Sequence, residues 1–486
     1  MEKYIFPKNF NAFFSKINRF EKIIFFILSF ILIYIYIASK KIDYYYFDSF
    51  HYWHLSKKFI NEGGNFSFLN FFDDYRGYFY PFILFLLRLV GSIIKIDGAI
   101  ALNIFNALIF SIISAILTPY IFEKLFNIKF NLLSYALLIF LFFYFWRGSF
   151  LYPLSDFPSI FILLISMVLL IKLKENIKIY YKIILAFLLG ITAYAIYNIR
   201  QIYLINIFII LFMAFFYLKD KLKTKIILIA FILIGFFICS IPQLLINIKY
   251  LNNLNFLVVT KYSNENLLLH LLKQGIIIQK YETNINTDIY QYNQVIFNDP
   301  LADKINININ SINSYFDYFF VVVKNPLTFL LIYLKHFFNG LDIWYYQIYI
   351  DNIYQNRNLF SFINYTLWFI FIFNIKNIYI KLNPKYSKIL YFVAIPIIFL
   401  IPMETEVRYY LPLFLLCYGM VVVLITSKIN NITNEIRKNN IKQFFKELIL
   451  HIKKEKLNII KIISLYFIFI VFCFILSFYT FTNVVK

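Results

Sequence analysis

Long runs of apolar residues, separated by short polar segments, recur along nearly the whole chain. A helix needs about 20 apolar residues, within a range of about 17–25, to cross the hydrocarbon core of a bilayer. Eleven runs meet that requirement or come close to it, and we expect each to be a membrane-spanning helix. The predicted spans are 22–39, 98–118, 131–147, 156–172, 183–199, 201–218, 226–247, 359–375, 389–403, 409–427 and 462–480. The pattern therefore predicts an all-α polytopic membrane protein.

Two further apolar stretches, 78–95 and 321–341, differ from these runs because basic residues interrupt them. Arg88 and Lys335 lie well inside the two stretches, and a charge at the centre of a bilayer costs about 2.5–3.5 kcal/mol. We expect both stretches to be juxtamembrane helices on the outer surface. The predicted number of spans is therefore about 11, and it would rise to 13 if both stretches crossed.

The distribution of Lys and Arg predicts the orientation, because cytoplasmic loops of membrane proteins carry an excess of both residues. With a cytoplasmic N-terminus and eleven spans, 28 of the 47 Lys and Arg residues lie in the inner segments. The outer side then holds a first loop, 40–97, and one large loop, 248–358. We expect an N-terminal catalytic module over 1–247, the extracytoplasmic loop region over 248–358, and C-terminal transmembrane helices over 359–486.

Composition excludes a soluble protein. Hydrophobic residues make up 61% of the chain and charged residues 15%, whereas soluble domains have roughly 45–50% and about 25%. The mean hydropathy is +0.71. In a soluble protein the formal net charge of +22 would indicate nucleic-acid binding. In this chain the excess lies in the inner segments, so we expect the lipid bilayer, and no nucleic acid, as its partner.

The first outer loop contains an acidic residue in an aromatic setting, in the sequence YYYFDSFHYWHL. A carboxylate at the membrane rim, such as Asp48, is suited to act as a general base for an acceptor hydroxyl group. Partial desolvation would raise its proton affinity toward the range that such a base needs. The alternative is that Asp48 only caps the N-terminus of a surface helix over 49–61.

Further charged residues are expected at the outer ends of the predicted spans. Asp156 lies at the start of the fourth span, where capping is the alternative role. Arg200 separates two nearly continuous spans, where it could hold a phosphate through two parallel hydrogen bonds or merely mark a turn. Glu404, Glu406 and Arg408 lie in the tight turn before the tenth span. Three charges in five residues between apolar spans are costly unless they are paired or used.

Two histidines are candidate metal ligands. His51 and His54 are three residues apart and share a helical face, with Asp48 one turn earlier. Two His residues without a clear third ligand are a weak signal, so a divalent metal stays an open alternative and no cofactor is certain. The three Cys residues lie inside apolar runs without Cys-x-x-Cys spacing, which predicts neither a disulfide framework nor a zinc site.

The order of these features resembles the GT-C fold of glycosyltransferases that use polyprenyl-phosphate-linked sugars. The nearest similarity is to protein mannosyltransferase and aminoarabinose transferase-like membrane proteins, glycosyltransferase families 39 and 83. Asp48 resembles the Asp that opens the family's D-[ED]-x-x-Y region, although Ser49 follows it where the family has an acidic residue. Other segments similar to family motifs are, in order, RGYFYPFILFLLRLVG, YPLSDFPSIF, IPQLLINIKYLNN, NPLTFLLIYLKHFFNGLD and ETEVRYYLPLF. The resemblance covers roughly residues 20–425.

The resemblance implies a GT-C-type bundle with an extracytoplasmic active site, in the inner (plasma) membrane of a bacterium. It implies a polyprenyl-phosphate-linked sugar donor, a lipid, glycan or protein acceptor, and inversion at the anomeric carbon. Asp48 is then the candidate base, and Asp156 is a second acidic residue that orients the acceptor or a metal. The candidates for binding the donor phosphate are Arg200, Arg408, Lys335 and Arg76. The candidates for binding the acceptor or the sugar are Tyr52, His51, Glu404 and Glu406.

Two other classes of membrane protein remain as alternatives. A flippase or transporter for a polyprenyl-linked glycan would carry charged residues inside its spans, whereas most charges here lie at the ends of the predicted spans. An O-antigen ligase or polymerase-like enzyme would need paired Arg residues in its large outer loop. In loop 248–358 the only Arg is Arg357.

Overall fold

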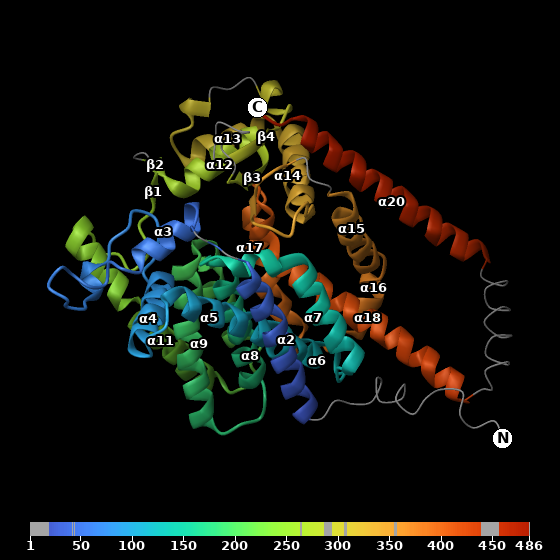
Figure 1. Ribbon diagram of the computed structural model, residues 1–486, viewed down its shortest axis with the longest axis horizontal. Coiled ribbons are helices and arrows are strands. Elements are labelled where there is room, and N and C mark those ends of the chain that lie inside the picture. The colour runs from blue at the N-terminus through green and yellow to red at the C-terminus, as the bar shows by residue number, and fades with distance from the viewer. Residues whose placement is uncertain are drawn as a thin grey trace.

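The computed structural model describes residues 19–40, 42, 44–262, 265–285, 294–305, 309–353, 357–438 and 456–485. It is a bundle of helices with short strands and helices gathered at one end (Figure 1). The helices are α2 (Arg19–Ser39), α3 (Phe47–Leu55), α4 (Phe79–Ile93), α5 (Gly98–Ile112), α6 (Thr118–Phe126), α7 (Leu132–Trp146), α8 (Asp156–Leu173), α9 (Ile179–Ile199), α10 (Ile205–Phe216), α11 (Leu222–Leu251), α12 (Leu267–Ile277), α13 (Tyr315–Lys324), α14 (Pro326–Leu341), α15 (Asn358–Phe373), α16 (Ile375–Lys381), α17 (Tyr391–Leu400), α18 (Leu411–Lys438) and α20 (Lys456–Thr482). The strands are β1 (Lys261–Tyr262), β2 (Glu265–Asn266), β3 (Ile278–Asn284), β4 (Gln294–Asn298) and β5 (Tyr349–Ile350).

Among the described residues, eight helices are long and apolar enough to cross a membrane, which indicates a multi-pass membrane protein. They coincide with eight of the eleven predicted spans. These helices are Phe20–Ser39, Gly98–Phe126, Leu132–Leu151, Asp156–Leu173, Ile179–Ile199, Leu222–Leu251, Val407–Asn430 and Leu457–Thr482. Because each predicted run is a local property of the sequence, its length translates directly into a helix of similar length.

The other three predicted spans are short or broken helices, so the structure does not establish eleven. The predicted span 359–375 is the pair α15 and α16, which is bent by 58°. The predicted spans 201–218 and 389–403 correspond to the helices Gln201–Phe216 and Ser387–Leu400, both in the range of 10–17 residues. If each bent pair counts as one span, the described residues contain up to ten.

The two stretches that are predicted to be juxtamembrane helices differ in their structure. The stretch 78–95 is one short helix, α4, whereas 321–341 lies across α13 and α14, which are bent by 106°. The bend falls at Pro326, because a proline has no N–H and disfavours helical angles in the residue before it. Asn325 accordingly has φ −129° and ψ 51°.

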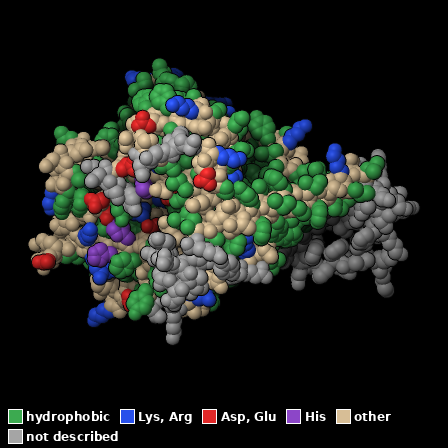
Figure 2. Space-filling view, turned by 90° about the horizontal axis from the view of Figure 1, so that it is seen from above, with side chains coloured by type: hydrophobic (Ala, Val, Ile, Leu, Met, Phe, Trp, Pro, Cys, Tyr) green, Lys and Arg blue, Asp and Glu red, His purple; other side chains and the backbone are tan. Residues whose placement is uncertain are grey.

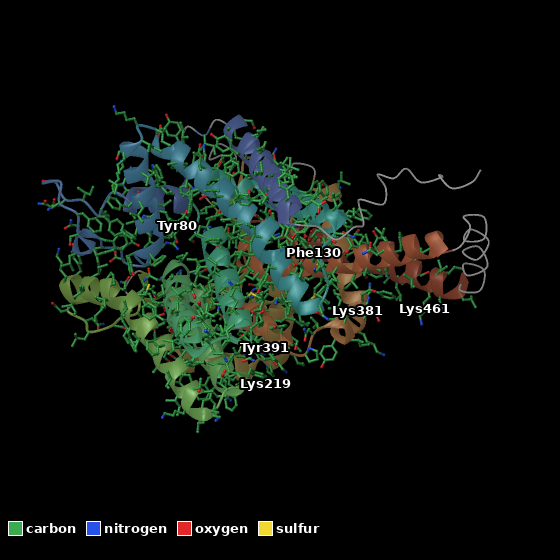
Figure 3. The ribbon with its side chains drawn as sticks, turned by 90° about the horizontal axis from the view of Figure 1, so that it is seen from below. Tyr80, Phe130, Lys219, Lys381, Tyr391 and Lys461 are labelled. Atoms are coloured by element: carbon green, nitrogen blue, oxygen red, sulfur yellow. The ribbon has the colours of Figure 1, made fainter. Side chains whose placement is uncertain are left out.

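The two ends of the bundle differ in their polar residues. The connections after α2, α7, α9 and α11 lie at the end that carries the strands, which we call the strand end (upper part of Figure 1). The connections after α6, α8, α10 and α16 lie at the opposite, lysine end, and Figure 3 labels Lys219 and Lys381 there. At this end Lys124 Nζ pairs with Glu175 Oε1 at 2.7 Å. The short helices α10 and α17 also connect the two ends.

Burial differs sharply between the spanning helices. In α8 and α18 the apolar segment is 78% and 83% buried, whereas in α2 and α20 it is 17% and 11% buried. A helix that is apolar on all sides must meet other helices or lipid, because water would not solvate its surface. We conclude that α8 and α18 form the centre of the bundle and that α2 and α20 line its periphery.

Two glycines allow α9 and α11 to pack closely. A Cβ atom added to Gly190 of α9 would overlap the carbonyl oxygen of Ile232, and one added to Gly235 of α11 would overlap that of Phe187. Small residues at such interfaces let helix backbones approach each other inside a membrane. The contact fixes the position of α9, and therefore of Arg200, which directly follows it.

A small sheet at the strand end adds a β element to a fold that the sequence predicts to be all-α. Its strand order is β4-β3-β5, with β3 antiparallel to β4 and parallel to β5. The chain after α20 reaches this sheet, where Val484 forms a bridge with Phe297 of β4. Buried Asp342, after α14, accepts hydrogen bonds from Trp344 Nε1 and from the Tyr365 hydroxyl, both at 2.6 Å. These contacts hold the large loop region against the bundle.

Candidate active site

Asp48 lies in the first turn of α3, at the strand end. The N-cap of this helix is Tyr46, whose backbone N–H donates to Ser49 Oγ at 3.0 Å. The helix therefore begins earlier than 49–61, and Asp48 is not its cap. Its carboxylate binds two guanidinium groups instead: Oδ1 accepts from Arg76 Nη2 at 2.6 Å and Oδ2 from Arg408 Nη2 at 2.9 Å. Both carboxylate oxygens thus have a positively charged partner.

Arg408 connects three acidic side chains. Besides binding Asp48, its Nε donates to Glu406 Oε2 at 2.5 Å, and its Nη1 lies 3.8 Å from Asp156 Oδ2. Asp156 also pairs with Arg200, whose Nη1 donates to Asp156 Oδ1. Three carboxyl groups and three guanidinium groups thereby form one connected network. We call its members the ionic cluster: Asp48, Asp156, Glu406, Arg76, Arg200 and Arg408.

The ends of three helices bring the ionic cluster together. Asp156 begins α8, Arg200 directly follows α9, and Arg408 lies in the short 3-10 helix before α18. A charge at the end of a spanning helix avoids the cost of the bilayer centre, and a carboxylate at a helix N-terminus is further stabilised by the helix dipole. The alternation of spans in the sequence predicts that these residues share one end of the bundle, and the structure places them there.

The surroundings alter the acid strength of the carboxyl groups at this end. Burial alone would raise the pKa of Asp48, but Arg76 and Arg408 outweigh burial and hold that pKa well below its usual range. For Glu406, burial raises the pKa by more than its ion pair with Arg408 lowers it. Burial, together with the charge of Glu406, raises the pKa of Glu404 to about 7. The strand end therefore contains a strongly acidic carboxyl group and two weakly acidic ones.

A large cavity of about 660 Å³ opens at the strand end. Its walls are mostly apolar and come from α10, α12, α17 and the connection over 253–260. Gln201, the residue after Arg200, is one of its lining residues, and so is Met403. Glu265 and other polar residues line the remaining part. A cavity with apolar walls and a few polar groups is suited to an amphipathic ligand.

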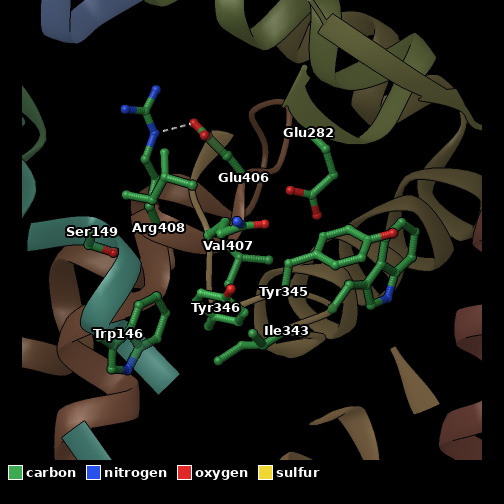
Figure 4. A pocket seen from close by; sticks show the side chains of 12 residues that line it. Trp146, Ser149, Glu282, Ile343, Tyr345, Tyr346, Glu406, Val407 and Arg408 are labelled. Atoms are coloured by element: carbon green, nitrogen blue, oxygen red, sulfur yellow. Dashed lines mark hydrogen bonds and ion pairs between the residues drawn. The ribbon is translucent and has the colours of Figure 1, made fainter. Parts of the chain in front are cut away.

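A second, much smaller cavity borders Arg408 and Glu406 (Figure 4). Its volume of about 30 Å³ leaves room for about one or two water molecules. Glu282 of β3 and Ser149 also line it, and the Ser149 hydroxyl has no hydrogen-bond partner among the described residues. Aromatic side chains complete the wall: Trp146, Trp344, Tyr345 and Tyr346. The cavity is therefore suited to one small polar group.

Two further predicted site residues, Tyr52 and His51, lie on the same helix as Asp48. The Tyr52 hydroxyl donates to Ser155 Oγ at 3.2 Å, and the guanidinium of Arg76 lies 5.1 Å from the centroid of the Tyr52 ring. Tyr52 is therefore in direct contact with the ionic cluster. His51 is paired elsewhere, because its Nε2 lies 2.8 Å from Asp73 Oδ1.

Lys335, the remaining predicted phosphate ligand, forms an ion pair outside the ionic cluster. Lys335 lies in α14, and its Nζ pairs with Asp299 Oδ1 at 2.6 Å. The Asp299 side chain is fully buried, so it depends on this lysine for its neutralising charge. Among the described residues, Lys335 has no ion pair with a member of the ionic cluster.

The residues around Asp48 do not fit a divalent metal. Within the described ranges, no group of three or more His, Cys, Asp or Glu side chains is arranged to hold a metal ion. His51 pairs with Asp73, and both oxygens of Asp48 bind guanidinium groups. A cation would therefore have to displace positive charges that are already in contact with the carboxylate. The hypothesis of a half-site with His54 finds no support in this geometry.

Several residues at the site cannot be predicted from the sequence. The hydroxyl of Tyr281, on β3, donates to Glu406 Oε2 at 2.7 Å and lies 2.5 Å from the Tyr409 hydroxyl oxygen. Tyr349, on β5, donates to the backbone oxygen of the residue that caps α3, at 3.0 Å. The chain contains 41 Tyr residues, and nothing in the local sequence distinguishes these two. Only Tyr409 has a signal, because it adjoins Arg408.

Seen from the strand end, acidic and histidine side chains gather over one part of the surface (Figure 2). In comparisons with known proteins, the chain matches no family model and no curated protein. The site consists of the ionic cluster, the large, mostly apolar cavity that Gln201 lines, and the small polar cavity beside Arg408.

Proposed function

We propose that this chain is an integral membrane glycosyltransferase that moves a sugar from a polyprenyl-phosphate-linked donor to an acceptor hydroxyl group. The observation that carries the proposal is the ionic cluster, in which the partly exposed carboxylate of Asp48 contacts Arg76 and Arg408. Transfer from a phosphate needs a base for the incoming hydroxyl group and positive charge for the departing phosphate. The resemblance to GT-C enzymes assigns these two tasks to the same residues.

Five of the six members of the ionic cluster then have a role in a single displacement step. The acceptor oxygen bonds to the anomeric carbon while its proton passes to Asp48. The bond from that carbon to the phosphate oxygen breaks on the opposite face, so the configuration inverts. Arg76, Arg200 and Arg408 stabilise the second negative charge that appears on the polyprenyl phosphate. Asp156 keeps Arg200 and Arg408 in position.

The large cavity supports a lipid-linked donor. Its volume of about 660 Å³ and its mostly apolar walls accommodate part of a prenyl chain. Because Gln201 lines the cavity, the phosphate at the end of such a chain would lie near Arg200. The smaller cavity, which borders Glu406, is suited to one hydroxyl group of the sugar or of the acceptor. The acceptor itself is a lipid, a glycan or a protein.

The orientation follows from the charge at the two ends of the bundle. We infer that the lysine end faces the cytoplasm and that the strand end is extracytoplasmic, in agreement with the positive-inside rule. A bacterial inner membrane is the corresponding location. The donor would then be used from the outer leaflet, where its phosphate is level with the ionic cluster.

The substitution Asp48→Asn tests this proposal. We expect the rate of sugar transfer to fall at least about 100-fold, because an amide cannot accept the proton of the acceptor. The measurement is the transfer of a labelled sugar from a polyprenyl-phosphate sugar in isolated membranes, with the thermal unfolding midpoint as a check on folding.

Asp97→Asn is the matched control for that experiment. Asp97 lies in the same outer loop and caps α5 by accepting from the Ala99 backbone N–H at 2.9 Å. An asparagine caps equally well, so this variant should retain full activity. Unchanged transfer by the Asp48→Asn protein would eliminate the base assignment. Movement of labelled lipid across the bilayer without any sugar transfer would instead favour a transporter.

A further inference from the structure

The carboxylate that acts as the base in the proposed function is not free in this structure. Asp48 Oδ1 is 2.6 Å from Arg76 Nη2, and Oδ2 is 2.9 Å from Arg408 Nη2. Hydrogen bonds from cations stabilise the charged form of a carboxylate and reduce its tendency to take up a proton. An acceptor hydroxyl group would meet a weak base whose oxygens are both occupied.

The guanidinium groups of Arg408 and Arg76 differ in the number of their acidic partners. Arg408 also binds Glu406 and lies 3.8 Å from Asp156, so it has acidic partners apart from Asp48. Arg76 has an ion pair with Asp48 alone among the described residues. The loop around Arg76 is anchored independently, because its backbone N–H donates to Asp73 Oδ2 at 2.8 Å. Its side chain is therefore the more easily detached of the two.

One N–H group of the Arg76 guanidinium, Nε, is free to bind an anion. Its Nε is buried and has no hydrogen-bond partner among the described residues. Nε and Nη2 lie on the same edge of a guanidinium group, and this edge can bind two oxygens of one phosphate. Asp48 uses only Nη2. A phosphate bound to both Nε and Nη2 would give the buried Nε a hydrogen-bond partner and would compete with Asp48 for Nη2.

The charge of the cluster adds to this competition. Its three carboxyl groups and three guanidinium groups balance formally, so a donor phosphodiester brings one surplus negative charge. That surplus weakens the hold of the guanidinium groups on Asp48 and increases the affinity of Asp48 for a proton. Phosphate binding and activation of the base are therefore linked through Arg76.

We propose, on the basis of the proposed function, that Arg76 is a clamp on Asp48 and that binding of the lipid-linked sugar donor opens this clamp. Without a bound sugar donor, Arg76 stays paired with Asp48, the base. When the phosphate of a lipid-linked donor binds the Nε–Nη2 edge, Arg76 releases Asp48, and the acceptor hydroxyl group can then donate its hydrogen bond. The donor consequently binds before the acceptor. After transfer, departure of the polyprenyl phosphate and of the proton restores the pair between Arg76 and Asp48.

Chemical labelling of Asp48 tests the clamp without requiring transfer. Carbodiimides react with carboxyl groups that are accessible and take up a proton, and mass spectrometry locates the modified residue. In the full-length protein in detergent, we expect added long-chain polyprenyl phosphate to increase the labelling of Asp48 several-fold. The corresponding polyprenol, which has no phosphate, should have no effect.

Variants of Arg76 separate the clamp from a structural role. Arg76→Met should show high labelling of Asp48 without any lipid and no further increase when lipid is added. Arg76→Lys keeps the charge but lacks the two-donor edge, so polyprenyl phosphate should increase labelling less than in the unmodified protein. Arg88→Met is the matched control. Arg88 lies in the same outer loop, 3.9 Å from the centroid of the Trp53 ring, and this variant should respond like the unmodified protein.

The pH profile supplies a second measurement. Because kcat/KM reports on the free enzyme, removal of one cation beside Asp48 should move the acid limb of the profile upward by about one pH unit. An unmoved acid limb in Arg76→Met overturns the clamp and leaves the proposed function standing. The same holds if the labelling of Asp48 does not respond to polyprenyl phosphate while sugar transfer is intact. A phosphate-dependent increase in labelling without transfer from any donor refutes the proposed function and retains the clamp.

Discussion

Glu404 and Asp48 lie at the same end of the bundle, but their surroundings change their pKa values in opposite directions. Asp48 contacts two guanidinium groups, which outweigh its burial and lower its pKa. Glu404 has burial and the charge of Glu406 acting together, and both raise its pKa, to about 7. A difference of one or two cationic neighbours thus decides whether a carboxyl group at this end is ionised at neutral pH.

Glu404 should make the stability of the protein decrease as the pH rises. Its pKa is 4.5 in an unfolded chain and about 7 in the folded protein, so the folded state binds the proton more tightly. The stabilisation is complete below pH 4.5 and is lost as the pH rises to about 7, with a total of up to about 3 kcal/mol. We expect the thermal midpoint in detergent to fall between pH 5 and pH 8.

Glu404→Gln should remove most of this pH dependence, because its amide does not titrate in that range. Glu62→Gln, at an exposed position of the first outer loop, is the control and should behave like the unmodified protein. An unchanged slope of the thermal midpoint against pH in the Glu404→Gln protein would show that another group causes the effect.

At the scale of elements, the contact between α9 and α11 determines where Arg200 lies. Gly190 and Gly235 bring the two backbones together. Near the end of α9, Asn198 accepts a hydrogen bond from the Phe79 backbone N–H at 2.8 Å, which also ties α4 to this helix. A shift of α9 would therefore move both Arg200 and the helix that follows Arg76 in the chain.

Gly190→Leu should separate α9 from α11. A larger side chain in a packed interface costs about 1–3 kcal/mol and displaces the backbone, so we expect a lower thermal midpoint and slower sugar transfer. The measurements are thermal unfolding in detergent and transfer in membranes. Gly63→Ala is the control, because the nearest atom to its added Cβ lies at 3.5 Å. Equal midpoints for both variants would contradict the tight packing.

The elements that the sequence predicts well are those that depend on local properties. Eight predicted spans coincide with helices of similar length because the length of an apolar run is local. The stretch 321–341 is wrong as a single helix, because Pro326 begins a new helix instead of lying inside one. The predicted spans 201–218 and 389–403 correspond to the helices Gln201–Phe216 and Ser387–Leu400, each of which begins with a 3-10 turn.

At the site, too, the sequence predicts what depends on local properties and does not predict what depends on tertiary packing. That Asp48, Asp156, Arg200 and Arg408 share one end follows from the alternation of the spans, and the structure confirms it. Which of them pair with each other depends on tertiary packing, so the sequence contains no sign of it. Tyr281 reaches Glu406 from a strand 125 residues earlier in the chain. For Lys335 the sequence indicates only a basic residue in an outer stretch, and it contains no sign of the distant partner Asp299.

At the scale of the whole molecule, the charge of +22 is unevenly distributed. Lys219 and Lys381 lie at the lysine end (Figure 3), whereas the three arginines of the ionic cluster are matched by three carboxyl groups. In the proposed orientation, the lysines of the lysine end would attract anionic lipid headgroups of the cytoplasmic leaflet. The neutral cluster, in contrast, retains the capacity to bind one more anion.

This asymmetry predicts which end is accessible from outside the cell. Single cysteines at exposed positions, Asn253→Cys at the strand end and Lys219→Cys at the lysine end, can be treated with a membrane-impermeant maleimide. In intact cells we expect label on the first variant alone, and on the second only after permeabilisation, because we propose from the positive-inside rule that the lysine end faces the cytoplasm. The unmodified protein is the control for its native Cys239, Cys417 and Cys473. The reverse pattern would place the ionic cluster in the cytoplasm, where an outer-leaflet donor could not reach it.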